Sequence, residues 1–190
     1  MAPLIYSLHA LFWAPFIIRG RLDRATGRAQ DGPAAHATKN PGILVGLHSV
    51  GIGVMYFGIG WGAFGGPLWS LFPFNIPAGI AVIAAGMALS LWTLLVFRSW
   101  RLRAELTADH ELCTSGPFGL VRHPIYTALV LLAAGSFLIL PNATTLAGIL
   151  VTAVTGDIRA RAEEVLLIGA FGERYRDYLK STRRFIPGLY

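Results

Sequence analysis

The sequence predicts an all-α integral membrane protein with five transmembrane helices. Apolar residues make up 54 % of the 190 residues and charged residues only 14 %, whereas a soluble domain carries about a quarter charged residues. The apolar residues gather in five stretches that reach or approach the roughly twenty residues a helix needs to cross a bilayer. The five stretches are Leu4–Ile18, Gly42–Gly62, Pro77–Phe97, Pro124–Leu140 and Ala143–Gly156.

The last two stretches are short, but the residues between them support both. Pro141 and Asn142 are typical of a tight turn, so we predict a helical hairpin in the membrane. In the second stretch, glycines four residues apart (Gly42 and Gly46, Gly58 and Gly62) favour close packing between membrane helices. These glycines lie inside a span and follow no strand, so they do not form a dinucleotide-binding loop.

The charged residues predict the topology. All Lys, Arg, Asp and Glu residues lie in Arg19–Lys39, Arg98–Arg122 and Asp157–Arg184. Five spans with the N-terminus outside place all three segments on one face, and the positive-inside rule makes that face, and the C-terminus, cytoplasmic. The Ala-, Gly- and Arg-rich composition suggests a prokaryotic inner membrane. The net charge of +6 then reflects loops near anionic lipid headgroups rather than nucleic-acid binding.

A polar motif precedes the fourth stretch. Ser115, Gly116 and Pro117 interrupt any helix, and Pro124 fits best at the first position of a new one, which makes His123 its cap. Arg122 and Tyr126 flank this cap at the cytoplasmic rim. Taken alone, these side chains are explained by contacts with lipid phosphates and by an interfacial aromatic belt.

A second polar cluster follows the fifth stretch. Arg159 and Glu163 are four residues apart and share a helical face, while Glu164 lies three residues from Arg161. Apolar residues follow this cluster, and ionisable groups so close to a membrane are candidates for a functional site. Because both arms of the hairpin end on one side, we predict that His123 and the Arg159–Glu163 pair lie together.

These motifs resemble the isoprenylcysteine carboxyl methyltransferase family and related phospholipid methyltransferases. The resemblance covers about Trp100 to Phe185. The matching residues are His110-Glu-Leu-Cys-Thr-Ser-Gly116, Arg122-His-Pro-x-Tyr126, Arg159-x-x-x-Glu-Glu164 and Phe171-Gly-x-x-Tyr175-x-x-Tyr178. It implies a three-span scaffold over residues 1–99 and a methyltransferase core over 100–190.

The resemblance implies that S-adenosylmethionine is the cofactor, bound in a cytoplasmic pocket that a C-terminal helical segment closes. A lipophilic or prenylated acceptor would enter from the bilayer. Arg159 would bind this acceptor, and Arg159 and Glu163 would be the catalytic pair. The residues expected at the cofactor are Arg103, His110, Glu111, Leu112, Cys113, Phe118, His123, Pro124, Ile125, Tyr126, Glu163 and Glu164. The family usually has Tyr in place of Phe118 and often Gly in place of Ala128.

The chemistry of methyl transfer agrees with this set. A carboxylate acceptor needs no general base, so alignment and removal of water supply much of the rate. The planar fork of Arg159 suits a carboxylate better than a lysine would. A single cysteine, Cys113, excludes an internal disulfide and a thiolate metal cluster, and we expect no metal.

Three alternatives stay open at this point. An amine or thiol acceptor on the same scaffold would need a base, for which Glu163 or Glu164 is the candidate. Membrane sterol reductases share a related hairpin but are typically much longer and need a nicotinamide pocket. A small membrane assembly or sensor subunit would have no enzymatic activity.

Overall fold

The computed structural model describes residues 1–25, 36–37, 41–66, 68–97, 105–106 and 112–190. Nearly all regular structure in these residues is helical, as predicted. The helices are α1 (Ala2–Ala25), α2 (Pro41–Ala63), α3 (Asn75–Val96), α4 (Pro124–Ile139), α5 (Ala143–Phe171) and α6 (Glu173–Ser181), with a short 3-10 helix η1 (Gly116–Gly119). Two strands of two residues, β1 (His36–Ala37) and β2 (Glu105–Leu106), pair antiparallel.

Three of these helices are long and apolar enough to cross a membrane: α1, α2 from Gly42 onward, and α3. This finding agrees with an integral membrane protein. Helix α4 is apolar but has only 16 residues, and α5 combines an apolar first half with a charged second half. The five-span topology therefore stays a prediction.

Helix α5 differs from the sequence-based expectation, which ended the fifth span at Gly156. It continues without a break for 29 residues to Phe171, about 44 Å at 1.5 Å per residue. Ala, Arg and Glu are strong helix formers, and they continue the helix where hydropathy falls. Arg159 and Glu163 therefore lie on the same rigid element as the predicted span.

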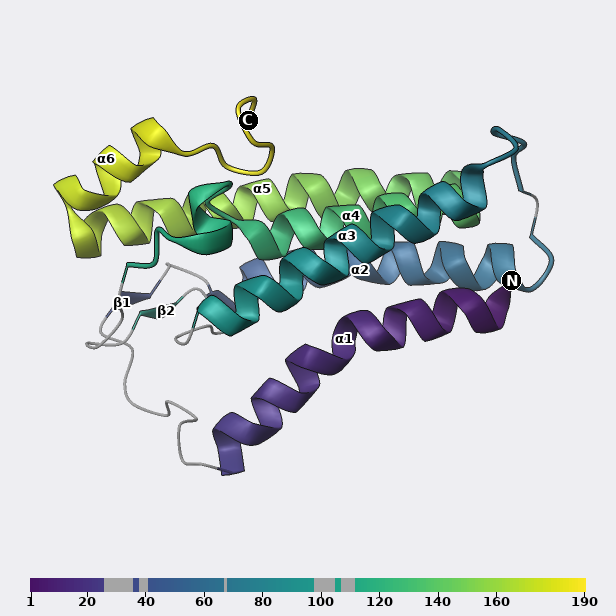
Figure 1. The fold of residues 1–190 in the computed structure, drawn as a ribbon, viewed down its shortest axis with the longest axis horizontal. Coiled ribbons are helices and arrows are strands. Elements are labelled where there is room, and N and C mark those ends of the chain that lie inside the picture. The colour runs from purple at the N-terminus through teal and green to yellow at the C-terminus, as the bar shows by residue number, and fades with distance from the viewer. Residues whose placement is uncertain (26–35, 38–40, 67, 98–104, 107–111) are drawn as a thin grey trace.

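The long helices run side by side in alternating directions, as Figure 1 shows. The N-terminus, the connection between α2 and α3, and the turn between α4 and α5 lie at one end of the bundle. The start of α4, the end of α5, and α6 lie at the other end, where the described charged residues gather. The predicted one-sided distribution of charge requires this arrangement, while the cytoplasmic assignment of that end remains a prediction.

Close helix contacts hold the hairpin to the rest of the bundle. Helix α2 packs along α5, and α3 packs along α4. A Cβ atom built on Gly58 would lie 2.6 Å from the Thr145 backbone nitrogen, and one on Gly148 would lie 2.7 Å from Met55 Cα. The predicted packing role is thus confirmed for Gly58. It is wrong for Gly42 and Gly46, since a Cβ atom built on either would have no atom of the described residues within 4 Å.

We expect Gly148→Ala to destabilise the protein, whereas Gly53→Ala should not. The new methyl group at position 148 would collide with backbone atoms of α2, and overpacking typically costs about 1–3 kcal/mol. Gly53 lies on α2 itself, and a Cβ atom added to it would have no atom of the described residues within 4 Å. Thermal unfolding in detergent measures both variants, and equal unfolding temperatures would contradict the close α2–α5 contact.

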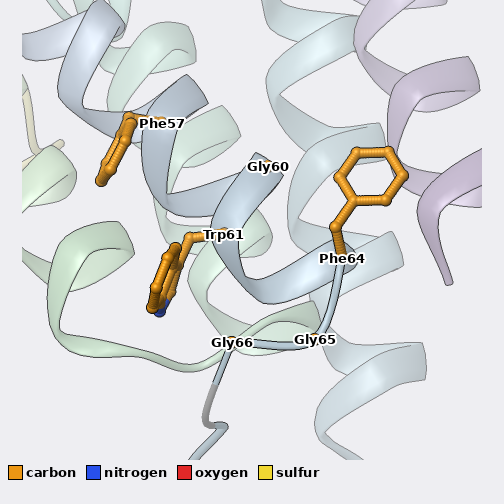
Figure 2. A pocket seen from close by; sticks show the side chains of 6 residues that line it. All are labelled: Phe57, Gly60, Trp61, Phe64, Gly65 and Gly66. Carbon is orange, nitrogen blue, oxygen red and sulfur yellow. The ribbon is translucent and has the colours of Figure 1, made fainter.

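An aromatic hollow lies at the end of α2, far from the described charged residues of the hairpin (Figures 1 and 2). Its lining consists of Phe57, Gly60, Trp61, Phe64, Gly65 and Gly66. The rings of Phe57 and Trp61 stack with centroids 6.5 Å apart, and Phe64 points to the other side (Figure 2). Such rings suit a membrane interface. Because this lining has no ionisable side chain, the hollow is not the predicted catalytic site.

Candidate active site

The polar motif forms the entrance to α4 as the sequence predicts. His123 is the N-cap residue of α4, and Pro124 is its first residue. Before them, Gly116 begins η1 with a φ of 60°, a left-handed conformation that glycine adopts without strain. Because Pro124 fits best as the first residue of a helix, His123 is placed at the N-cap of α4, at the charged end of the bundle.

The C-terminal segment crosses directly over this motif. The Arg122 backbone N–H donates to the Arg183 carbonyl (2.8 Å), and that of His123 donates to the Arg184 carbonyl (3.1 Å). The Thr127 hydroxyl donates to the Phe185 carbonyl at 3.0 Å. The segment is therefore fixed to the start of α4 by main-chain hydrogen bonds. The expected role of this segment in closing a cofactor pocket stays a prediction.

Glu164 is the centre of a buried ion-pair network. Arg122 Nε donates to its Oε1 at 2.9 Å, and Arg184 donates to both oxygens, at 3.0 and 2.7 Å. The Arg122 and Glu164 side chains are each 9 % exposed. Burial alone would raise the pKa of the Glu164 carboxyl, but His123, Arg184 and Arg122 outweigh it and lower that pKa.

This network excludes two simpler explanations of the polar motifs. Arg161, three residues from Glu164, does not pair with it and instead donates to Asp157 at 2.6 Å. The guanidinium of Arg122 also donates to the Thr182 carbonyl, so it is held by the protein rather than directed to lipid phosphate. The two arginines join the start of α4, the end of α5 and the C-terminal segment. Glu164 therefore holds these three segments together.

Glu163 has a different environment, although it is the neighbouring residue. Its Oε1 accepts hydrogen bonds from Arg159 Nε (3.1 Å) and from the Tyr126 hydroxyl. Its Oε2 lies 3.6 Å from His123 Nδ1, too far for a hydrogen bond, and accepts none from the described residues. The Glu163 side chain is 20 % exposed. One oxygen of Glu163 therefore accepts no hydrogen bond from the described residues, and the His123 ring lies beside it.

The Tyr126 ring lies at the centre of the cluster. His123 stacks on it with centroids 5.6 Å apart, and Arg159 Cζ lies 5.5 Å from its centroid, within range of a cation–π contact. The Arg159 side chain is only 5 % exposed. The predicted meeting of His123 with the Arg159–Glu163 pair is thus confirmed.

His48 of α2 also belongs to this cluster, and the sequence analysis missed it. Its ring contacts Tyr126 with centroids 5.5 Å apart, and its Nδ1 lies 3.2 Å from Thr155 Oγ1. His48 is 4 % exposed. The signal that could have found it is an ionisable residue within a membrane span, which is a candidate for function by default.

The remaining predicted cofactor residues that the structure describes lie around the entrance to α4. Leu112 and Cys113 are half-buried just before η1. The Phe118 ring packs on Phe97, and its carbonyl accepts a hydrogen bond from Tyr178 at 2.6 Å. Ile125 is half-buried against the core. Arg103, His110 and Glu111 lie outside the described residues.

The charges around His123 predict how stability varies with pH. Burial favours the neutral imidazole, but Glu163 and Glu164, 3.6 and 3.4 Å away, raise the pKa of His123 above its ordinary 6.5. Protonated His123 therefore stabilises the fold below pH 6.5, and this contribution is lost as pH rises through the higher folded-state pKa. The pKa values of Glu163 and Glu164 are lowered from 4.5, so their contribution is lost only as pH falls below 4.5.

We therefore expect the contribution of His123 to the unfolding temperature to be complete between about pH 4.5 and pH 6.5 and to fall on the alkaline side. His123→Gln should remove most of the alkaline fall, because glutamine does not titrate. Thermal unfolding in detergent across this pH range tests the expectation. An identical alkaline fall in the wild type and in His123→Gln would contradict the assigned charge on His123.

Comparison with known proteins bears on the same part of the chain. Residues 78–169 match the isoprenylcysteine carboxyl methyltransferase family. A similar protein is the "Protein-S-isoprenylcysteine O-methyltransferase" of Schizosaccharomyces pombe, which is 36 % identical over 80 residues. The matched part is 42 % of this chain and 34 % of that protein. The family resemblance predicted from the motifs is confirmed.

The matched region corresponds to three helices of the structure. It contains nearly all of α3 and α5 and the whole of α4, and so includes His123, Tyr126, Arg159 and Glu163. Helix α2 with His48 and the segment with Arg184 lie outside the match. These outer parts complete the cluster from elsewhere in the chain.

Proposed function

We propose that this protein is an integral membrane methyltransferase that transfers a methyl group from S-adenosylmethionine to the carboxylate of a lipophilic acceptor. The observation that carries the proposal is the environment of Glu163. This half-buried carboxylate is held by Arg159 and Tyr126 and keeps one oxygen free of hydrogen bonds from the described residues. The family match and the name of the relative support the reaction class.

Glu163 suits the cofactor end of the site. An ammonium group or a ribose hydroxyl could donate to its Oε2, and a charge-assisted hydrogen bond of this kind is about twice as strong as a neutral one. His123 can add a hydrogen bond, since its Nε2 has no hydrogen-bond partner in the described part of the chain. S-Adenosylmethionine supplies the electrophilic methyl group, and these residues orient it.

Arg159 suits the acceptor end. It lies on the apolar side of Glu163, one helical turn nearer the predicted membrane span. Its guanidinium is nearly buried, so it can hold one carboxylate oxygen and orient the other toward the methyl group. Transfer forms a methyl ester and breaks the bond between sulfur and the methyl carbon, so no proton has to be removed.

An amine or thiol acceptor is supported less well. Such an acceptor must lose a proton. Burial alone would raise the pKa values of the two candidate bases, Glu163 and Glu164, but nearby cations and hydrogen-bond donors outweigh burial and lower them. A carboxylate with a lowered pKa is a poor base near neutral pH. The pairing of Glu163 and Glu164 with cations therefore favours a carboxylate acceptor.

Binding of S-adenosylhomocysteine tests the cofactor site. Purified wild-type protein should bind it, and His123→Ala and Glu163→Ala should each weaken binding about tenfold or more, because a hydrogen bond to a charged group contributes about 1.5–3 kcal/mol. Glu173→Ala, on the exposed face of α6, is the control and should bind normally. Equal affinities of all four proteins by calorimetry would contradict the site, and no binding at all would favour a non-enzymatic membrane subunit.

A further inference from the structure

A tight apolar turn follows the segment that crosses the start of α4. Pro187 and Gly188 are its central residues, and Gly188 has a φ of 75°. The Leu189 N–H donates to the Ile186 carbonyl at 3.0 Å. A proline followed by a glycine with positive φ is typical of a type II turn. The turn leaves two large apolar side chains at the surface, since Ile186 is 49 % exposed and Leu189 is 76 % exposed.

The backbone of this turn suits surroundings of low polarity. The N–H groups of Phe185 and Ile186 both donate to the main-chain oxygen of Tyr190 at 2.7 Å, and the Tyr190 N–H donates to the Ile186 carbonyl at 3.1 Å. Pro187 has no N–H group. A backbone N–H without a partner is costly in lipid, so a segment at the edge of a bilayer must pair its own. The turn therefore needs few hydrogen bonds from water.

The turn is fixed to the face of α5 that is exposed along the predicted fifth span. Residues three or four apart in a helix share a face, and this face carries Leu150, Val154, Asp157 and Arg161. Leu150 and Val154 are each 59 % exposed, as expected of side chains that meet lipid. The Tyr190 hydroxyl donates to Asp157 at 2.9 Å and accepts from Arg161 at 2.9 Å. The turn thus lies on the lipid-facing side of α5.

The turn also lies at the depth where the predicted fifth span ends. Asp157, which binds Tyr190, directly follows Gly156, the last residue of that predicted span. Figure 1 shows the C-terminal end of the chain farther from the charged end of the bundle than α6, and within the length that α3 covers. On the predicted topology this is the boundary between lipid headgroups and acyl chains, where apolar side chains and tyrosine rings are favoured.

The opposite side of the turn contacts the candidate active site. The centroid of the Phe185 ring lies 6.0 Å from that of His123 and 6.5 Å from that of Tyr126. The Phe185 carbonyl accepts the hydrogen bond from Thr127 described above. A displacement of the turn would therefore move Phe185 away from the two rings.

We propose that residues 185–190 form an interfacial anchor, in which Ile186 and Leu189 insert between lipid headgroups and upper acyl chains. Contact with the bilayer holds the C-terminal segment, and Phe185 with it, against the candidate active site. The inference concerns a surface outside the site and does not depend on which cofactor or acceptor the site binds.

Arg161 supplies the polar part of this anchor by binding the phosphate of an anionic phospholipid. Its side chain is 58 % exposed, and it donates from Nε to Asp157 and from Nη2 to Tyr190. A guanidinium has five N–H groups, so Arg161 can also donate to a phosphate at the membrane surface, where a charge-assisted hydrogen bond forms.

Quenching by lipids measures the depth of the turn. A fluorescent dye is attached to Leu189→Cys in a Cys113→Ser background, and the protein is placed in nanodiscs whose lipids are brominated near the top of the acyl chain. The loss of fluorescence should be close to that of a dye at Val154→Cys, on the exposed face of α5. A dye at Lys180→Cys, on α6 with a side chain that is 75 % exposed, should keep its fluorescence.

The same measurement can contradict the anchor in two ways. Equal quenching at positions 189 and 180 would overturn it. The absence of quenching at position 154 would contradict the predicted fifth span, and the inferred depth of the turn would fall with it. Circular dichroism shows that each variant is folded.

Anionic lipid tests the role of Arg161. Exchange of phosphatidylcholine for phosphatidylglycerol should increase quenching at position 189, and Arg161→Gln should remove this increase while Arg161→Lys keeps it. Lys180→Gln removes the same charge from α6 and should leave the increase intact. An equal increase in Arg161→Gln and Lys180→Gln would overturn the phosphate contact.

Hydrogen exchange tests whether the anchor holds the C-terminal segment without any attached dye. The Arg122 and His123 N–H groups donate to this segment, so their exchange reports its local opening. Leu189→Ser should accelerate their exchange in nanodiscs, whereas Lys180→Ser should not. Equal exchange in the two variants would overturn the proposed coupling between the bilayer and the segment.

Discussion

Replacing Glu164 with alanine is expected to destabilise the protein by about 3–5 kcal/mol, the cost of removing one partner from a buried ion pair. The change leaves Arg122 and Arg184 without the carboxylate that joins them. It also releases the C-terminal segment from the start of α4. Chemical or thermal unfolding in detergent, followed by circular dichroism, measures the loss.

The exposed pair on α6 provides the matched control. Glu173 pairs with Arg176 three residues away, and its side chain is 75 % exposed. Exposed ion pairs contribute only about 0–1 kcal/mol, so Glu173→Ala should unfold almost as the wild type does. Equal stability of the Glu164 and Glu173 variants would contradict the role of Glu164 in holding the C-terminal segment to the start of α4.

Arg159→Lys and Glu163→Gln should affect different substrates, although the two residues lie one helical turn apart. Lysine keeps the charge but loses the planar fork, so Arg159→Lys should lower turnover by about tenfold or more while cofactor affinity stays nearly constant. Glutamine keeps the shape of Glu163 but loses its charge. Glu163→Gln should therefore weaken cofactor affinity by about tenfold. Kinetics with each substrate varied in turn measure both effects.

The competing explanation is that Arg159 and Glu163 only pair with each other, at 3.1 Å. In that case both variants would act through stability and would alter the two substrates equally. Small, equal effects on cofactor and acceptor would rule out the division of roles between Arg159 and Glu163.

Local chemistry predicted the entrance to α4 and the hairpin turn correctly. Pro124 can begin a helix but cannot continue one, which places His123 at the cap whatever surrounds it. Asn142 caps α5 by accepting from the backbone N–H groups of Thr144 and Thr145, as a short polar residue at a turn does. The meeting of His123 with Glu163 followed from the hairpin topology.

The partners of Glu164 could not be predicted because they depend on the path of the chain. Arg184 lies twenty residues away in the sequence and reaches Glu164 only because the segment after α6 returns over α4. Arg161, the near neighbour in the sequence, pairs with Asp157 four residues before it. Short-range spacing therefore does not identify the partners of a carboxylate at a meeting point of three segments.

His48 was missed for a different physical reason. A single histidine in an apolar stretch has no periodic pattern, and nothing near it in the sequence indicates which helix it faces. Its importance appears only when α2 packs along α5 and brings the ring beside Thr155 and Tyr126. Recognition of a site from sequence is thus strongest where motifs are continuous and weakest where one side chain arrives from a distant helix.

Methyl transfer by the purified protein tests the central claim most directly. Protein in detergent is incubated with S-adenosylmethionine labelled in its methyl group and with N-acetyl-S-prenylcysteine, and the labelled product is extracted and treated with mild base. We predict a labelled product that releases methanol on this treatment, as a carboxyl methyl ester does, with no such product from Arg159→Ala. A wild-type product that resists base, or the absence of any labelled product, would contradict carboxylate methylation at this site.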